Sequence, residues 1–188
     1  MIRDLILKNR SYRRFDTGRK LTRDELLELI DLARISSSAS NRQPLRFHPS
    51  WEDPENGKIF STMSWAGFIE DWDGPGPDER PAGYIVVLQD MNVSDDCSID
   101  IGIASQSILL GAVEMGLGGC MVASFDRNEI ASVLSLPEHI VPGLIIALGR
   151  PVEKVVLEPV RDGDTRYYRD EDGTHHVPKR SLNEILFP

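Results

Sequence analysis

Three short stretches of this chain carry polar groups at a density that suits ligand binding. They are Arg10-Ser11-Tyr12-Arg13-Arg14-Phe15, the turn from Ser36 to Phe47, and Val177-Pro178-Lys179-Arg180-Ser181-Leu182. The middle stretch offers serine hydroxyls, the amides of Asn41 and Gln43, and guanidinium groups, which hydrogen-bond polar ligands without being strong acids or bases. Two basic clusters near opposite ends of the chain, with a donor-rich turn between them, indicate one anionic ligand held by both ends.

The chain as a whole is acidic, which sets the basic clusters apart. Its 188 residues include 21 Lys and Arg against 30 Asp and Glu, a formal net charge of −9. Such a surface disfavours nonspecific binding to nucleic acid or to an anionic membrane. Arginine suits bidentate contact with phosphate. For the segment 10–14 alone, a solvated basic face is an equally good interpretation, but its pairing with Lys179 and Arg180 favours an anion site.

Other site chemistries have weaker support in the sequence. Gly116-Leu117-Gly118-Gly119 lies between a predicted helix and a predicted strand, the reverse of the order in a dinucleotide-binding loop, so we interpret it as a tight turn. His175 and His176 are neighbours, whose side chains point to opposite sides of an extended segment, which disfavours a shared metal ion. The sequence contains no Gly-x-Ser-x-Gly motif and no marked pair of carboxylates. We therefore expect neither a metal site nor a catalytic side chain.

The elements that position these residues are predicted to be helices mixed with scattered strands. Thr22 and Glu25 form a capping box, which predicts the start of a helix. This helix ends in the turn from Ser36 to Phe47, which we call the serine-rich turn. The longest predicted helix, 99–117, is apolar on nearly every face, as is typical of a core or interface helix. The remaining expectations are helices over 2–9, 126–134 and 181–187, strands over 45–48, 84–88, 120–123 and 144–149, and a polar irregular segment over 151–176.

These elements predict an α+β fold, a modest sheet wrapped by helices, in a single domain over 1–188. No segment has the run of about 20 apolar residues that a bilayer crossing needs. The N-terminus also lacks the long apolar run of a signal peptide. We therefore expect a soluble cytoplasmic protein that binds neither membrane nor nucleic acid.

The three polar stretches resemble motifs of the FMN-dependent nitroreductase family. Arg10-Ser11-x-Arg13-x-Phe15 resembles the N-terminal signature that holds the FMN phosphate and the adjacent flavin edge, and Lys179 with Arg180 matches the basic pair that closes the phosphate site. Ser38-x-x-Asn41-x-Gln43-Pro44 resembles the turn that lines the ribityl pocket. The loop after the long helix matches one whose backbone amide contacts the flavin. The resemblance implies an FMN site made of Arg10, Ser11, Arg13, Ser38, Ser40, Asn41, Gln43, Ala123, Ser124, Lys179 and Arg180.

Four positions depart from the pattern of the family. Asn9, Ser37, Leu45 and Ser124 stand where the family often has Arg, Pro, Trp and Gly. At the first of these positions one phosphate contact is lost, unless Arg14 supplies it instead.

The resemblance also implies a fold and an activity. The implied fold is nitroreductase-like, with a central, mostly antiparallel sheet flanked by helices, and the helix 99–117 is buried in a homodimer. The implied enzyme is an FMN-dependent oxidoreductase that passes electrons from NAD(P)H to nitroaromatic, quinone or similar small-molecule acceptors by a ping-pong mechanism. A diverged flavin-binding protein without NAD(P)H turnover, or a family member with other reductive chemistry, stays open. Trp65, Phe68 and Trp72 either cover a flat substrate or pack into a core or interface.

Overall fold

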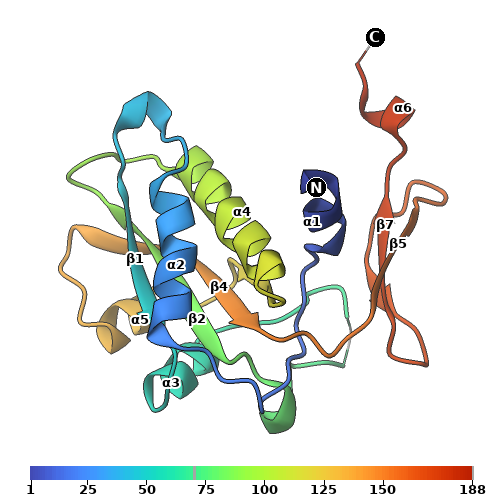
Figure 1. Cartoon of the computed structure of the whole chain (residues 1–188), viewed down its shortest axis with the longest axis horizontal. Helices are drawn as coiled ribbons and strands as arrows, with labels where there is room; N and C mark the ends of the chain where they lie inside the picture. Colours follow the sequence, from blue (N-terminus) through green and yellow to red (C-terminus); the bar gives the residue numbers. More distant parts are fainter. Residues whose placement is uncertain (70, 188) are drawn as a thin grey trace.

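A four-stranded antiparallel sheet forms the centre of the structure, a computed structural model that describes residues 1–69 and 71–187 (Figure 1). Its strands, in the spatial order β1-β2-β4-β3, are β1 (Leu45–Ser50), β2 (Gly83–Asp90), β3 (Gly118–Val122) and β4 (Ile140–Gly149). All three neighbouring pairs are antiparallel, which confirms the predicted central sheet. Residues 51–72 contain Trp51, Phe60, Trp65, Phe68 and Trp72, and we call this stretch the aromatic segment. Residue 70 within it, and residue 188 at the end of the predicted domain 1–188, lie outside the described residues.

Helices cover both faces of this sheet. Alternate residues of β2 point to opposite sides: Ile85 and Val87 belong to one apolar cluster and Val86 to the other. Because both faces are buried, the central strands are continuous apolar runs rather than alternating ones. The helices on the two faces are α2 (Arg23–Arg34) with α4 (Ser98–Glu114), and α3 (Glu55–Ser61) with α5 (Arg127–Val133).

The predicted helix ends follow from local side-chain chemistry. The hydroxyl of Thr22 accepts a hydrogen bond from the amide of Glu25 at 3.3 Å, and the Glu25 carboxylate accepts one from the amide of Thr22 at 2.9 Å. This confirms the capping box of α2. The helix α4 ends three residues before the predicted boundary, because Met115 caps it and Gly116 takes a left-handed φ of 73°.

A second, three-stranded sheet lies near the C-terminus, where the sequence predicted an irregular segment over 151–176. That prediction was wrong. The strands β5 (Val155–Pro159) and β7 (His175–Lys179) are parallel, and β6 (Tyr168–Arg169) pairs with β7 on its other side. This sheet stands beside α1 (Ile2–Lys8), apart from the central sheet, and leads to α6 (Leu182–Ile185) (Figure 1). The short helices predicted at both ends of the chain are therefore confirmed.

The described residues also form two short 3-10 helices, η1 (Ala39–Asn41) in the serine-rich turn and η2 (Pro77–Glu79) before β2. Across the described ranges 1–69 and 71–187, no helix is both long and apolar enough to cross a membrane.

Candidate functional site

A pocket of about 680 Å³ lies between the N-terminal segment, the C-terminal sheet and α4, and we call it the basic pocket. The charged side chains of its wall are the cations Arg10, Arg13, Lys179 and Arg180. Within the described part of the chain, no carboxylate lines this pocket, and no ion pair involves any of these four side chains. Unpaired cations around one hollow of an acidic protein indicate an anionic ligand.

Arg13 is the most buried of the four cations, with 9% of its surface exposed. Its Nη1 atom donates to the carbonyl of Ser11 at 3.3 Å and lies 3.4 Å from Nε2 of His175. The guanidinium carbon sits 4.9 Å from the centre of the Tyr167 ring. The backbone amide of Arg13 donates to the buried carboxylate of Glu153. The segment 9–15 and the C-terminal sheet therefore hold this guanidinium between them.

Segments near both ends of the chain line the basic pocket. Nη2 of Arg10 donates to the carbonyl of Ile6 at 2.6 Å, while its Nε is buried and has no hydrogen-bond partner among the described residues. Lys179 ends β7, where its carbonyl accepts from the amide of Val160 at 3.1 Å, and Arg180 follows directly. The structure thus brings together five of the predicted site residues, namely Arg10, Ser11, Arg13, Lys179 and Arg180.

A smaller pocket of about 210 Å³ adjoins the basic pocket, and we call it the loop pocket. The predicted residues Ala123 and Ser124 line it, and it shares Arg13, Met121 and Tyr167 with the basic pocket. Cys120 also lines it, and burial raises the pKa of this thiol, so the group stays protonated.

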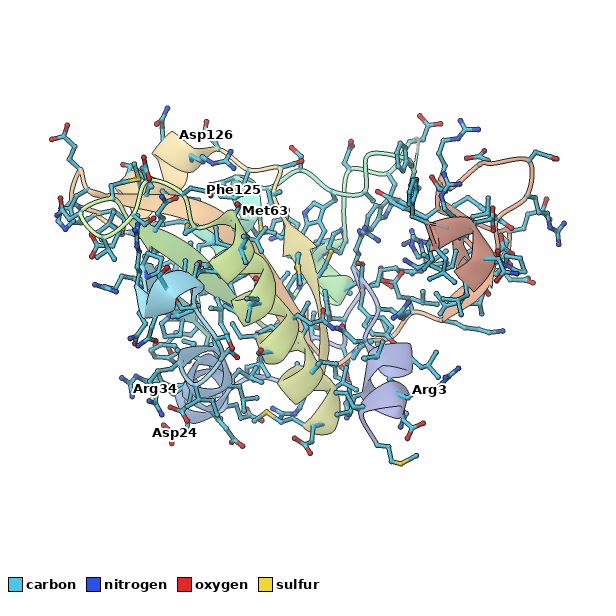
Figure 2. All side chains as sticks on the ribbon, turned by 90° about the horizontal axis from the view of Figure 1, so that it is seen from above. Arg3, Asp24, Arg34, Met63, Phe125 and Asp126 are labelled. Atoms are coloured by element: carbon cyan, nitrogen blue, oxygen red, sulfur yellow. The ribbon has the colours of Figure 1, made fainter. Side chains whose placement is uncertain are left out.

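Backbone contacts fix the loop that contains Ala123 and Ser124. The amide of Ser64 donates to the carbonyl of Ser124 at 2.8 Å, and Met63 forms a β-bridge with Phe125. Figure 2 labels Met63, Phe125 and Asp126 in one region of the molecule, where the two segments run past each other. The loop is therefore held against the chain that leads into the aromatic segment.

The aromatic segment contacts Tyr167, a residue that lines both pockets. Phe68, which is 58% exposed, makes an edge contact with Tyr167 at 5.1 Å between ring centres. Trp72 lies under the guanidinium of Arg169 at 4.7 Å. Trp65 is buried and lines the loop pocket, as the core interpretation predicted, whereas Phe68 keeps an open face beside the site.

The serine-rich turn lies apart from both pockets within one chain. Ser38, with Gln43, lines a separate pocket of about 350 Å³ between α2, β1 and the start of α4, and Ser40 and Asn41 lie in the same turn. The hydroxyl of Ser38 accepts from the amide of Gln43 at 2.9 Å, and the Gln43 side chain donates to the carbonyl of Asn41 at 3.3 Å.

The backbone of this turn takes an unusual conformation. Ser40, Asn41 and Gln43 have left-handed φ values of 50°, 53° and 54°. A non-glycine residue in such a conformation costs roughly 1–3 kcal/mol of folding free energy, and it persists only where the surrounding structure holds it. Such residues are concentrated at active sites and ligand-binding sites.

Three residues that the sequence analysis missed help to build the site, namely Glu153, Tyr167 and His175. His175 is 1% exposed, and within residues 1–69 and 71–187 its Nδ1 has no hydrogen-bond partner. Burial, together with the charges of Arg13 and Arg169, lowers the pKa of His175 to about 4, so the ring is neutral near pH 7. Side chains alternate along β7, and His175 points inward. In the sequence, this alternation was an argument against a metal site only, but it also indicates that one of the two histidines points into the protein.

Asn9 is the first position that departs from the family pattern, and Arg14 is the candidate that could replace the lost phosphate contact. Asn9 lines the basic pocket. Arg14 does not line it, and its Nε donates instead to the Glu79 carboxylate at 2.6 Å. The basic pocket therefore carries an amide at this position rather than a further cation.

The sequence model of the nitroreductase family matches residues 6–56 and 94–150. The chain belongs to this family. The matched ranges contain the N-terminal cluster, the serine-rich turn and the Ala123-Ser124 loop, but the C-terminal sheet with Lys179 and Arg180 lies outside them.

Individual relatives are distant but extend over most of the chain. A protein of Methanothermobacter thermautotrophicus, whose name assigns it provisionally as an NADH dehydrogenase or NAD(P)H nitroreductase, is 28% identical over 172 residues, 86% of this chain and 83% of the relative. FMN reductase (NADPH) of Bacillus subtilis is 26% identical over 164 residues, 79% of this chain and 65% of the relative.

Solved structures show the fold. A nitroreductase family protein of Streptococcus pneumoniae superposes with a TM-score of 0.74 at 17% identity, over 100% of both chains. An FMN-dependent nitroreductase of Clostridium difficile superposes with a TM-score of 0.64 at 20% identity, over 82% of this chain and 89% of the other. The predicted nitroreductase-like α+β fold is confirmed.

Proposed function

We propose that this protein is an FMN-dependent oxidoreductase, which takes hydride from NAD(P)H and passes electrons to nitroaromatic, quinone or similar small-molecule acceptors. The single observation that carries the proposal is the basic pocket of a protein with net charge −9. Four cations line this pocket, and none of them forms an ion pair with a carboxylate in the described part of the chain. Relatives named for FMN and NAD(P)H support the same assignment.

The residues of the two pockets fit a flavin nucleotide. The Nε of Arg10 and the Nδ1 of His175 are buried polar atoms without partners, which a ligand with phosphate and hydroxyl oxygens would satisfy. Arg10, Ser11, Lys179 and Arg180 would hold the phosphate. The volume of about 680 Å³ lies in the usual range for small-molecule sites, and the adjoining loop pocket extends it.

The protein groups near the flavin would bind, orient and tune it. When bound, FMN itself supplies the hydride chemistry, so the protein needs no catalytic acid or nucleophile. Arg13 lies where the two pockets join, and its positive charge would stabilise negative charge on the ligand beside it. A backbone amide of the Ala123-Ser124 loop would donate to the same ligand. Phe68 and Tyr167 offer ring surfaces to a flat acceptor.

We further propose a homodimer with a site at each end of its interface. Large apolar side chains are exposed at the start of α4, where Ile99 is 67% exposed, and along the C-terminal segment, where Leu182, Ile185, Leu186 and Phe187 are 61–98% exposed. Exposed apolar groups of this kind are typical of an interface when they gather. The start of α4 lies at the serine-rich turn, where Asp100 accepts from the amide of Ala39 at 3.2 Å, and Leu109 lines the basic pocket.

A two-fold contact along α4 would therefore bring the turn of one copy to the basic pocket of the other. In that arrangement Ser38, Ser40, Asn41 and Gln43 complete the site of the partner. We also propose that residues 1–188 form one domain and that the protein is cytoplasmic.

Anaerobic reduction tests the proposed activity. The purified chain is loaded with FMN and mixed first with NADH, then in a fresh sample with NADPH, while the flavin absorption is recorded. We expect one or both donors to bleach the flavin bands and a quinone or nitroaromatic compound to restore them. Bound FMN that neither donor reduces would instead support the flavin-binding protein without turnover. Failure to take up FMN at all would overturn the cofactor assignment.

A further inference from the structure

We propose that His175 is a positioning residue for Arg13. Its Nε2 accepts a hydrogen bond from the guanidinium and keeps this cation at the junction of the basic pocket and the loop pocket. The inference rests on the proposed FMN function, because the guanidinium that His175 holds is the one that would face the flavin.

Arg13 needs such a partner because its guanidinium is buried and forms no ion pair with a carboxylate among residues 1–69 and 71–187. Its side chain contacts the carbonyl of Ser11, the ring of Tyr167 and Nε2 of His175, all of which are uncharged. A carboxylate in the place of His175 would form an ion pair and cancel the positive charge that the site offers to a ligand. A neutral imidazole fixes the direction of the guanidinium without placing a negative charge against it.

The chemistry of the two side chains sets the protonation of the imidazole. A guanidinium only donates hydrogen bonds, so at a separation of 3.4 Å the Nε2 of His175 must act as the acceptor. The ring proton then resides on Nδ1, which is buried without a partner in the described chain. The lowered pKa of His175, about 4, agrees with this uncharged form. The unpartnered Nδ1–H is a second indication that the site is complete only with a ligand.

The C-terminal sheet holds the imidazole itself in place. His175 begins β7, the central strand of that sheet, and pairs with Val155 of β5 and Arg169 of β6. Its amide donates to the carbonyl of Lys154 at 2.8 Å, and its ring lies 5.3 Å from the ring of Tyr167. Because strands on both sides hold His175, its imidazole can in turn hold the guanidinium of Arg13. Supporting residues keep binding groups in position in this way.

The test compares two polar substitutions that differ in reach. In H175Q the amide oxygen can take the place of Nε2 and accept from Arg13, whereas in H175N the shorter amide occupies the place of Nδ1 and cannot reach it. FMN binding to the apoprotein of the full chain is titrated by flavin fluorescence. We expect H175N to bind FMN about tenfold more weakly than the wild type, and H175Q to stay within about threefold.

A double-mutant cycle separates positioning from a general structural effect. In the R13M background, H175N is expected to cause no further loss of FMN affinity, since the group it positions is gone. The reduction potential of the bound flavin gives a second measurement. H175N should move the potential in the same direction as R13M, and H175Q should leave it near that of the wild type.

The outcomes distinguish this inference from the proposed function. A wild-type chain that does not bind FMN overturns both. Normal FMN binding and potential in H175N overturn the inference alone, and so does an equal loss of affinity from H175N with and without Arg13. Circular dichroism shows whether each variant folds. If H175N does not fold, H175E replaces it: this variant matches H175Q in shape but neutralises Arg13, so equal FMN binding by the two contradicts the inference.

Discussion

Ser11 forms a parallel β-bridge with Gly119, so the N-terminal segment lies directly against the edge strand β3. The amide of Tyr12 donates to the carbonyl of Gly119 at 3.0 Å. A Cβ atom at position 119 would lie 2.5 Å from the carbonyl oxygen of Ala147 in β4. Glycine at this position therefore permits β3 to pair with β4 while the N-terminal segment, with Arg10 and Arg13, borders the basic pocket.

The substitution G119A should destabilise the protein. The added methyl group meets backbone rather than the end of a flexible side chain, so the strand has to move, and we expect the free energy of unfolding to fall by about 1–3 kcal/mol. Urea unfolding measures the change. The matched control is G57A, in α3, where the nearest atom to a new Cβ is a carboxylate oxygen of Asp53 at 3.4 Å. G57A should be neutral or stabilising by about 0.5–1 kcal/mol, and equal effects of the two would contradict the packing argument.

Removing two cations from the basic pocket should release FMN without unfolding the chain. In the double variant R10A/R180A two charged contacts to the phosphate are lost, and we expect FMN affinity to fall on the order of 100-fold. Equilibrium titration of the apoprotein measures the affinity, and circular dichroism checks the fold. The control R3A/R23A removes the same charge from exposed positions, one of them Arg3 on α1 (Figure 2). If R10A/R180A retains FMN as tightly as the control, the phosphate binds elsewhere.

The buried His175 should make the apoprotein lose stability as the pH falls. Its pKa is about 4 in the folded chain and about 6.5 in the unfolded chain, so between these values only the unfolded chain takes up the proton. Stability is full above about pH 6.5 and declines below it, by about 2 kcal/mol between pH 7 and pH 4.5. H175Q cannot titrate and should lack this part of the decline. Urea unfolding of both proteins at several pH values measures it, and identical pH profiles would show that the imidazole is not held neutral.

Charge on the outer face of α4 should break the proposed homodimer. In I99D a carboxylate replaces an exposed apolar side chain, and its desolvation in an interface would cost several kcal/mol. We expect a monomer by sedimentation and weaker FMN binding, since the serine-rich turn of the partner is withdrawn. I99V keeps the surface apolar and should remain dimeric. A wild-type chain that sediments as a monomer while it binds FMN would exclude the shared site.

The sequence predicted those elements whose signals are local. The capping box of Thr22 and Glu25 and the left-handed Gly116 act within a few residues. The start of α2 follows from the first and the end of α4, to within three residues, from the second. The C-terminal sheet does not follow in this way, because His175 pairs with Val155 and Arg169 only after the chain has turned back twice. Hydrophobic periodicity within one short strand cannot predict such pairings.

The candidate site shows the same contrast between residues that local motifs predict and residues that tertiary contacts bring in. Motif positions identified Arg10, Ser11, Arg13, Lys179 and Arg180, which meet in one pocket. The contributions of Glu153, Tyr167 and His175 arise from tertiary contacts around Arg13, and each of these side chains is ordinary by its sequence context. The sequence motif of the serine-rich turn resembles part of the same site, but the turn lines a separate pocket. A motif cannot predict this separation, because it depends on how the whole chain folds.

The most direct test of the account compares FMN with riboflavin, which lacks the phosphate, in equilibrium titrations of the wild-type apoprotein. Because the cations of the basic pocket lack carboxylate partners, phosphate contacts should supply much of the binding energy. We predict that FMN binds at least on the order of 100-fold more tightly than riboflavin. Equal affinities would contradict the assignment of the basic pocket as a phosphate site.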